Sequence, residues 1–317
     1  MEQLVSRPEL ESLLEAIARR TPDPRAGIFG PGSISWKINR EAALFLGAGR
    51  AALLQLAHPW VAGALAEHSN LLGDPIARFH NTFRIVFTMI FGSLDQALAA
   101  ARSLHTLHTH IRGELREPVA RWPRGAHYEA NEIDALRWVF ATLIESAVLA
   151  YECVLPLSSE ERDGYYNESK TMAALFGIPS SSLPENWSTF RGYTRGMVVS
   201  DTLGVDPTAR STAHALLSGA GSWVHAPRWY RALTIEWMPD RLRQAFALEH
   251  STVDRRASVR ARRWLPRVWK ILPASVRFVG PWHEAQARLH ERPPGPIAHF
   301  SNRFWIGRSL LPFGNDE

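Results

Sequence analysis

Apolar residues recur along most of this chain at intervals of three and four positions, which is the spacing of one face of an α-helix. Segments that alternate apolar and polar residues, as half-buried strands do, are not evident. We therefore expect an all-α fold. The pattern predicts helices over residues 42–56, 61–68, 76–91, 94–115, 132–151, 158–176, 189–203, 207–217 and 239–248.

The organisation of the chain favours one large domain. No repeat, low-complexity run or linker interrupts residues 30–290, so we expect a single bundle of roughly ten or more helices there. A helical segment over residues 1–29 precedes it. Closely spaced prolines begin at Pro293, and residues 291–317 are therefore expected to form a less ordered tail.

The composition limits which cofactors the chain can hold. Cys153 is the only cysteine, which excludes an intramolecular disulfide, a cysteine-based zinc site and an iron–sulfur cluster. The sequence C-x-x-C-H, which attaches haem covalently, is also absent. Twelve tryptophans and fourteen phenylalanines are best explained by a large helical core, and a buried apolar ligand is the alternative.

The chain shows no sequence signal for secretion or membrane crossing. Its N-terminus is polar and acidic and carries no apolar core of a signal peptide. The most apolar stretch, residues 42–66, is interrupted by Arg50 and by His58-Pro59, which a helix crossing a bilayer should not carry at its centre. We expect a buried helical pair here and a cytoplasmic protein.

Positive charge is concentrated late in the chain, where Asp254 is the only acid among many basic residues. The segment is either a solvated helix face with its arginine stems packed on the domain, or a peripheral contact with an anionic membrane surface. We expect no nucleic-acid partner. The basic residues are Arg255, Arg256, Arg260, Arg262, Arg263, Arg267 and Lys270.

Thirteen histidines make metal binding the first chemistry to consider, because neutral imidazole is the commonest metal ligand in proteins. Three of them, His105, His108 and His110, lie together on the helix predicted over residues 94–115. A single inward histidine on a long helix suits the proximal ligand of a haem. His105 and His108 share a face, whereas His110 points elsewhere. Taken alone, each is more often a hydrogen-bonded structural residue than a ligand.

Arg78 and Thr82 are four residues apart and therefore share one face of a predicted helix that is otherwise apolar. A guanidinium and a hydroxyl placed in this way can hydrogen-bond bound dioxygen or a developing oxyanion in a dry pocket. The alternative is structural: Arg78 would form a salt bridge with Asp74, and Thr82 would bond the carbonyl four residues before it.

A third group of polar residues lies within the apolar stretch. Pro59 forces a break between two helices and places His58 at the bend. Glu67 and His68 follow on the second helix. A carboxylate in apolar surroundings is a candidate general base, although Glu67 could equally be a capping or surface residue.

In their order, these and further short motifs resemble a known family: the all-helical, haem-dependent oxygenases that include the bacterial rubber oxygenases (latex-clearing proteins) and the fungal oxygenase MpaB. The resemblance spans about residues 30–288. Its motifs are Gly30-Pro31-Gly32-Ser33, Arg40-Glu41, LLQLAHP at residues 53–59, His68-Ser69, Asp74-Pro75, Arg78-x-x-x-Thr82, Phe91-Gly92, His108-x-x-Ile111-Arg112-Gly113, Tyr128-x-Ala130-Asn131, Leu136-x-Trp138-Val139, Asp163-x-Tyr165-Tyr166 and Leu175-x-Gly177-Ile178-Pro179.

The resemblance implies a helical fold that encloses a non-covalently bound haem b and cleaves carbon–carbon double bonds of isoprenoid chains with dioxygen. By position, His108 matches the proximal iron ligand, and Arg78 and Thr82 match the polar pair on the distal side. Glu67 lies near the catalytic carboxylate of the family. Arg112 falls in the same motif as His108 and is assigned to the cofactor site.

Two positions depart from the family pattern. Asn81 stands where the rubber oxygenases have a lysine beside the iron, and asparagine cannot act as the same strong ligand. Phe140 stands where many relatives have a histidine. Our hypothesis is a haem b oxygenase for an apolar, unsaturated substrate, and the alternative is a helical haem- or lipid-binding protein without catalysis, possibly associated with a membrane surface.

Overall fold

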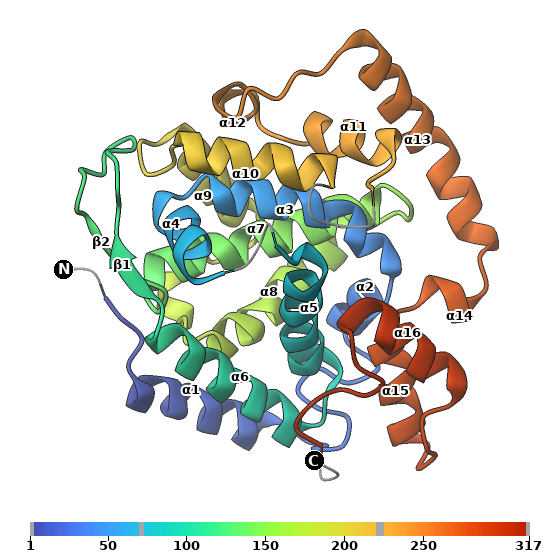
Figure 1. Cartoon of the computed structure of the whole chain (residues 1–317). Coiled ribbons are helices and arrows are strands. Elements are labelled where there is room, and N and C mark those ends of the chain that lie inside the picture. The colour runs from blue at the N-terminus through green and yellow to red at the C-terminus, as the bar shows by residue number, and fades with distance from the viewer. Residues whose placement is uncertain (1–2, 70–72, 220–224, 315–317) are drawn as a thin grey trace.

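The computed structural model describes residues 3–69, 73–219 and 225–314 of the chain. Within these residues sixteen α-helices surround a continuous core, accompanied by two short 3-10 helices and one two-stranded antiparallel sheet (Figure 1). The prediction of an all-α fold is confirmed. None of the described helices is both long enough and apolar enough to span a bilayer.

The elements follow in this order: α1 (Arg7–Arg20), α2 (Ile34–Asn39), η1 (Ala42–Gly47), α3 (Ala48–Leu56), α4 (Pro59–His68), α5 (Pro75–Phe91), α6 (Leu94–Thr109), β1 (Arg112–Glu114), β2 (His127–Glu129), α7 (Ile133–Glu152), α8 (Ser159–Leu175), η2 (Ser180–Ser182), α9 (Trp187–Val199), α10 (Pro207–Ser218), α11 (Arg228–Glu236), α12 (Asp240–Ala245), α13 (Thr252–Ile271), α14 (Ala274–Arg277), α15 (Gly280–Leu289) and α16 (Pro296–Ile306).

Helices α3, α7 and α8 lie at the centre of the molecule, and the other helices cover them (Figure 1). Gly47, where η1 meets α3, allows close packing on α7, because a Cβ atom here would lie 2.5 Å from the carbonyl oxygen of Ser146. Buried Arg50 of α3 pairs with Glu145 of α7 at 2.5 Å. The charge that interrupts the apolar stretch therefore ties two central helices together.

Helix α6 ends earlier than the hydrophobic pattern predicts. The predicted helix continued to residue 115, but α6 ends at Thr109 and the chain turns into strand β1. The side chains of Thr109 and His110 both approach the carbonyl of Thr106 and so compete with the next helical hydrogen bonds. Strand β1 then pairs with β2, which gives the small sheet that the sequence did not indicate.

The C-terminal segment is a packed helix, and the expectation of a less ordered tail over residues 291–317 is wrong for α16. Helix α16 packs on α5 and α15, and Trp305 stacks on Phe45 with ring centroids 3.7 Å apart. Pro296 occupies the first turn of α16, where proline favours helix initiation, and Gly307 ends the helix at a φ of 71°.

One buried carboxylate fastens the C-terminal helices to the start of the domain. The side chain of Glu41 is 1% exposed and accepts hydrogen bonds from Arg277 Nε (2.7 Å) and Nη2 (2.6 Å) and from Trp269 Nε1 (2.8 Å). Removing one partner from such a group leaves a buried charge without compensation.

We predict that Glu41→Ala lowers the free energy of unfolding by about 3–5 kcal/mol, because Arg277 and Trp269 then lose a shared buried acceptor. Chemical denaturation followed by circular dichroism measures the loss. Glu15→Ala is the control: its ion pair with Arg19 has both side chains 69% exposed and is expected to contribute less than about 1 kcal/mol. Equal losses in the two variants would contradict the assignment.

His58 lies at the break between α3 and α4 that Pro59 predicts. Its side chain is buried beside Trp60 and Trp122, and Nδ1 has no hydrogen-bond partner. Burial, with a smaller contribution from Arg121, lowers the pKa of His58 from 6.5 to about 4. The folded protein therefore keeps this imidazole neutral under conditions in which the unfolded chain would protonate it.

This depressed pKa predicts a dependence of stability on pH. Between about pH 6.5 and pH 4 the unfolded chain binds a proton at His58 that the folded chain does not, so the free energy of unfolding falls as the pH falls. The free energy of unfolding of His58→Gln should depend less steeply on pH across this range, by the uptake of about one proton on unfolding. An unchanged slope would contradict a neutral His58 in the folded state.

Candidate functional site

Helices α5 and α6 form an antiparallel pair that places two predicted site residues level with each other. Asp74 caps α5, Ser93 caps α6, and only Gly92 and Ser93 separate the two helices. Each helical residue advances about 1.5 Å, so residues equally far from the turn lie side by side. Arg78 and His108 are almost equally far from it, and the charge of Arg78 lowers the pKa of His108.

His108 is half-buried, and its pKa is lowered from 6.5 to about 4. Burial is the largest cause, followed by the positive charge of Arg78 and the nearby His105. The imidazole is therefore neutral at neutral pH. Neutral imidazole is the form that binds a metal ion, because protonation would occupy the donor nitrogen.

The three histidines at the end of α6 differ in their hydrogen-bond partners. His105 is buried with Nε2 2.9 Å from the carbonyl oxygen of Val5, which is a structural role. His110 is exposed, and its Nδ1 lies 2.8 Å from the carbonyl oxygen of Thr106. Within the described chain, His108 has no such backbone acceptor.

Asn131 lies beside His108 and was not assigned a role from the sequence. Its amide nitrogen donates to the carbonyl of His105 at 3.2 Å, which fixes the orientation of the side chain. Its buried Oδ1 forms no hydrogen bond of full geometry with a described residue. This oxygen nevertheless lies near the His108 ring, where it raises the pKa of His108 slightly against the larger effect of burial. Such an acceptor orients a metal-binding imidazole.

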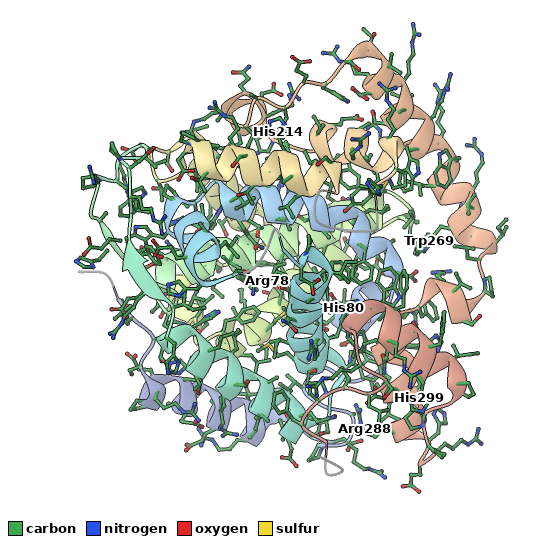
Figure 2. The ribbon with its side chains drawn as sticks, in the orientation of Figure 1. Arg78, His80, His214, Trp269, Arg288 and His299 are labelled. Carbon is green, nitrogen blue, oxygen red and sulfur yellow. The ribbon has the colours of Figure 1, made fainter. Side chains whose placement is uncertain are left out.

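Arg78 carries a positive charge without a counter-ion. Arg78 is exposed, yet partial desolvation by its neighbours lowers the pKa of its guanidinium. Among the described residues its guanidinium forms no ion pair or hydrogen bond, and the Asp74 carboxylate caps α5 instead. Figure 2 shows Arg78 on the inner side of α5, opposite His80, which faces α16.

Thr82 and Asn81 have partners of their own. Thr82 Oγ1 donates to the carbonyl of Arg78 at 3.0 Å, as the structural alternative predicted, and its lone pairs stay available as acceptors. The exposed Asn81 accepts a hydrogen bond from Arg84 through Oδ1. Asn81 is therefore engaged within α5 itself.

Glu67 anchors the small sheet to α4. Its Oε2 accepts a hydrogen bond from the Tyr128 hydroxyl at 2.5 Å, and Oε1 accepts one from Arg116 Nε at 3.1 Å. These contacts, led by Tyr128, lower the pKa of Glu67, so the carboxylate is ionised at neutral pH and is a weaker base than a free one. A second contact joins α4 to the sheet: the carbonyl oxygen of Arg112, an exposed residue of β1, lies 3.0 Å from His68 Nε2.

The two helices that carry Glu67 and Arg78 leave apolar surface incompletely covered. Helix α4 is mostly apolar, yet it buries only Pro59, Trp60 and Ala62. In α5 only the last turn, Phe87–Phe91, is buried, whereas residues 75–86 are half-buried or exposed. A bulky apolar group bound here would cover surface that the protein itself does not.

The donor set fits haem better than a metal bound only by side chains. In the described ranges, no cluster of three or more His, Cys, Asp or Glu residues is arranged to hold a metal ion. Haem iron takes four ligands from the porphyrin and needs only one protein histidine. His108, neutral and oriented by Asn131, meets that requirement.

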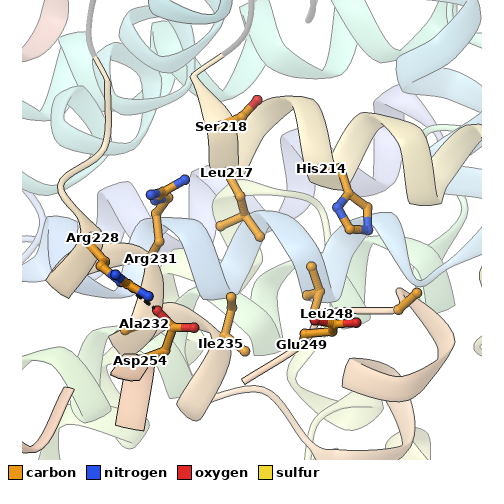
Figure 3. A pocket seen from close by; sticks show the side chains of 11 residues that line it. His214, Leu217, Ser218, Arg228, Arg231, Ala232, Ile235, Leu248, Glu249 and Asp254 are labelled. Atoms are coloured by element: carbon orange, nitrogen blue, oxygen red, sulfur yellow. Dashed lines mark hydrogen bonds and ion pairs between the residues drawn. The ribbon is translucent and has the colours of Figure 1, made fainter. Parts of the chain in front are cut away.

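Two cavities lie elsewhere and include neither Arg78 nor His108. The larger, about 570 Å³, lies between α10, α11 and the start of α13 (Figure 3). Arg228 and Asp254 pair across its edge at 2.9 Å. The second, about 350 Å³, surrounds the ion pair of Arg50 and Glu145.

Comparison with known proteins identifies the family. The family model described as ER-bound oxygenase mpaB/B'/Rubber oxygenase, catalytic domain, matches residues 36–268. This segment contains Arg78, His108 and Asn131 and makes up most of the chain, and the predicted family is confirmed. No curated protein and no solved structure shows significant similarity. The chain carries an oxygenase catalytic domain and belongs to the family of mpaB/B' and the rubber oxygenases.

Proposed function

We propose that the protein is a haem b-dependent oxygenase that acts with dioxygen on an apolar, unsaturated substrate of isoprenoid or lipid type. The observation that carries the proposal is the proximity of a neutral, half-buried His108 to Arg78, whose charge no acid balances in the part of the chain that the structure describes. The family membership supports oxygenase chemistry, and the half-buried apolar side chains of α4 and α5 support an apolar cofactor and substrate.

In this proposal each residue has a defined task. His108 would hold the iron, and Asn131, fixed by its hydrogen bond to the His105 carbonyl, would accept a hydrogen bond from the His108 ring. Bound haem supplies the redox chemistry. Arg78 supplies a positive charge that stabilises negative charge developing on oxygen. Thr82 lies on the same helix face, where the lone pairs of its hydroxyl can accept a hydrogen bond. The ionised Glu67 is the group that accepts a proton, and Arg112 contributes to cofactor binding.

We predict that His108→Ala abolishes haem binding. The purified protein, titrated with haemin, should show a sharp Soret band that shifts on reduction with dithionite and again with carbon monoxide. The variant should lack this band, because the iron loses its protein ligand. His110→Ala is the matched control and should bind haem like the unmodified protein, because His110 is exposed at the end of the same helix. Haem content that is equal in all three proteins would remove His108 from the ligand role.

We predict that Arg78→Met keeps haem but lowers oxygen-dependent turnover about 100-fold, the loss typical of removing one donor that stabilises developing charge. Oxygen uptake with squalene, a polyisoprene oligomer or an unsaturated fatty acid measures turnover, and the absorption spectrum measures haem. Arg124→Met, at an exposed arginine between the two strands, should leave both unchanged. Haem binding without oxygen uptake on any substrate would favour the non-catalytic haem- or lipid-binding alternative.

A further inference from the structure

Large apolar side chains are exposed mainly in one part of the chain. Of thirteen exposed large hydrophobic residues in the described ranges, ten lie between residues 253 and 310. Single exposed apolar residues are common on soluble proteins, but a concentration of this kind marks an interaction site. Six of them define what we call the C-terminal apolar face: Trp264, Val268, Ile271, Ile297, Phe300 and Phe304.

Helix α13 contributes the first half of this face. It buries Ser258, Ala261 and Leu265, and it packs on α11. Trp264, Val268 and Ile271 follow at intervals of four and three residues, so they form a stripe directly beside the buried residues. The ring of Trp264 contacts Trp229 of α11, with ring centroids 5.3 Å apart, and is still 38% exposed. Ile271 is 80% exposed. The helix therefore has a wide apolar side that the protein covers only in part.

Helix α16 contributes the second half. It directs Ala298, Asn302 and Ile306 into the protein. Ile297 and Phe300 lie three residues apart, with Phe304 one turn further on, and all three remain outside. Phe300 is 77% exposed. Figure 1 shows α13, α14 and α16 along the same side of the molecule, coloured orange to red.

The charge around this face is strongly positive. Residues 255–310 contain twelve Arg and Lys residues but only Glu284 and Glu291 as acids. Glu284 is buried and bonds Asn302, and Glu291 pairs with Arg25. Several basic residues on α13 and α16 are exposed and form no ion pair with an acid in the part of the chain that the structure describes: Arg260, Arg263, Arg267, Lys270 and Arg303.

We propose that the C-terminal apolar face docks on the surface of an anionic lipid bilayer. The aromatic and aliphatic side chains would enter the boundary of headgroups and acyl chains, and the arginines would extend their stems along it to reach the phosphates. A nucleic acid would satisfy the arginines but leave Phe300 and Ile297 without an apolar partner. The lipid surface satisfies both kinds of side chain.

This inference does not depend on the proposed oxygenase chemistry. The face uses α13 and α16, whereas the candidate haem ligand lies on α6, and α16 lies beyond the segment that the family model matches. Haem content and lipid binding can therefore be measured separately, and a negative result for one proposal leaves the other standing.

The test is co-sedimentation of the full chain with vesicles of phosphatidylcholine alone or mixed with phosphatidylglycerol. We expect binding only to the anionic vesicles, and weaker binding at about 1 M than at about 0.1 M salt, because the screening length falls from about 10 Å to about 3 Å. Absence of binding to anionic vesicles, or equal binding to both kinds, overturns the proposal.

Variants assign the binding to the face. Removing Arg260, Arg263 and Arg267 together (each to Gln) should weaken binding about 100-fold, since each basic residue near an anionic surface contributes about 1 kcal/mol. Phe300→Ser combined with Phe304→Ser should weaken it at least about tenfold. The matched controls Val199→Ser, at a residue 76% exposed on α9, and Arg124→Gln should bind like the unmodified protein.

Circular dichroism and the midpoint of chemical denaturation confirm that the variants are folded. Size-exclusion chromatography tests whether a second copy of the chain covers the face, and a binding assay with duplex DNA tests whether a nucleic acid does. Variants that bind vesicles like the unmodified protein would overturn the assignment. A dimer that the Phe300/Phe304 variant dissociates, or DNA binding without vesicle binding, would assign the face to a second copy or to nucleic acid.

Discussion

Glu41 is a charged side chain buried where two distant parts of the chain meet, and a buried carboxylate is tolerated only when its charge is balanced. Arg277 and Trp269 provide that balance and thereby fix α13 and α14 against the start of the domain. The chain then continues into α15 and α16, which cover the outer side of α5. With its outer side covered by apolar packing, α5 presents Arg78 on the inner side, level with His108.

Much of the helical architecture could be predicted from the sequence, because a 3.6-residue apolar period is a local property of the chain. The start of α8 at Ser159, with Ser158 as its cap, and its closure at Gly177 follow from local capping chemistry. Helix α16 was not predicted because a proline in the first turn of a helix cannot be distinguished by sequence alone from prolines in an irregular segment. The end of α6 was missed because Leu115 fits the helical period, although it is buried from a loop beside the small sheet.

The candidate site was only partly predictable for a related reason. Spacing placed Arg78 and Thr82 on one helix face and His105 and His108 on one face of the next helix, and only the family resemblance selected His108. The structure distinguishes His108 because its neighbour His105 is already bonded to the carbonyl of Val5. Such a contact joins residues far apart in sequence, so the local pattern does not reveal it. The ionised state of Glu67 depends on Tyr128 in the same way. No local pattern links Asn131 to His108.

The stacking of Trp305 on Phe45 has a consequence for where the folding unit ends. Phe45 also contacts Phe79 and Phe83, so the rings of η1, α5 and α16 form one aromatic cluster. The segment that defines the family stops within α13, before α16 supplies its tryptophan. A chain cut at that boundary would leave the aromatic side of α5 bare to water and would lose the Arg277 partner of Glu41. We therefore expect the folding unit to extend beyond residue 268, where the match to the family model ends.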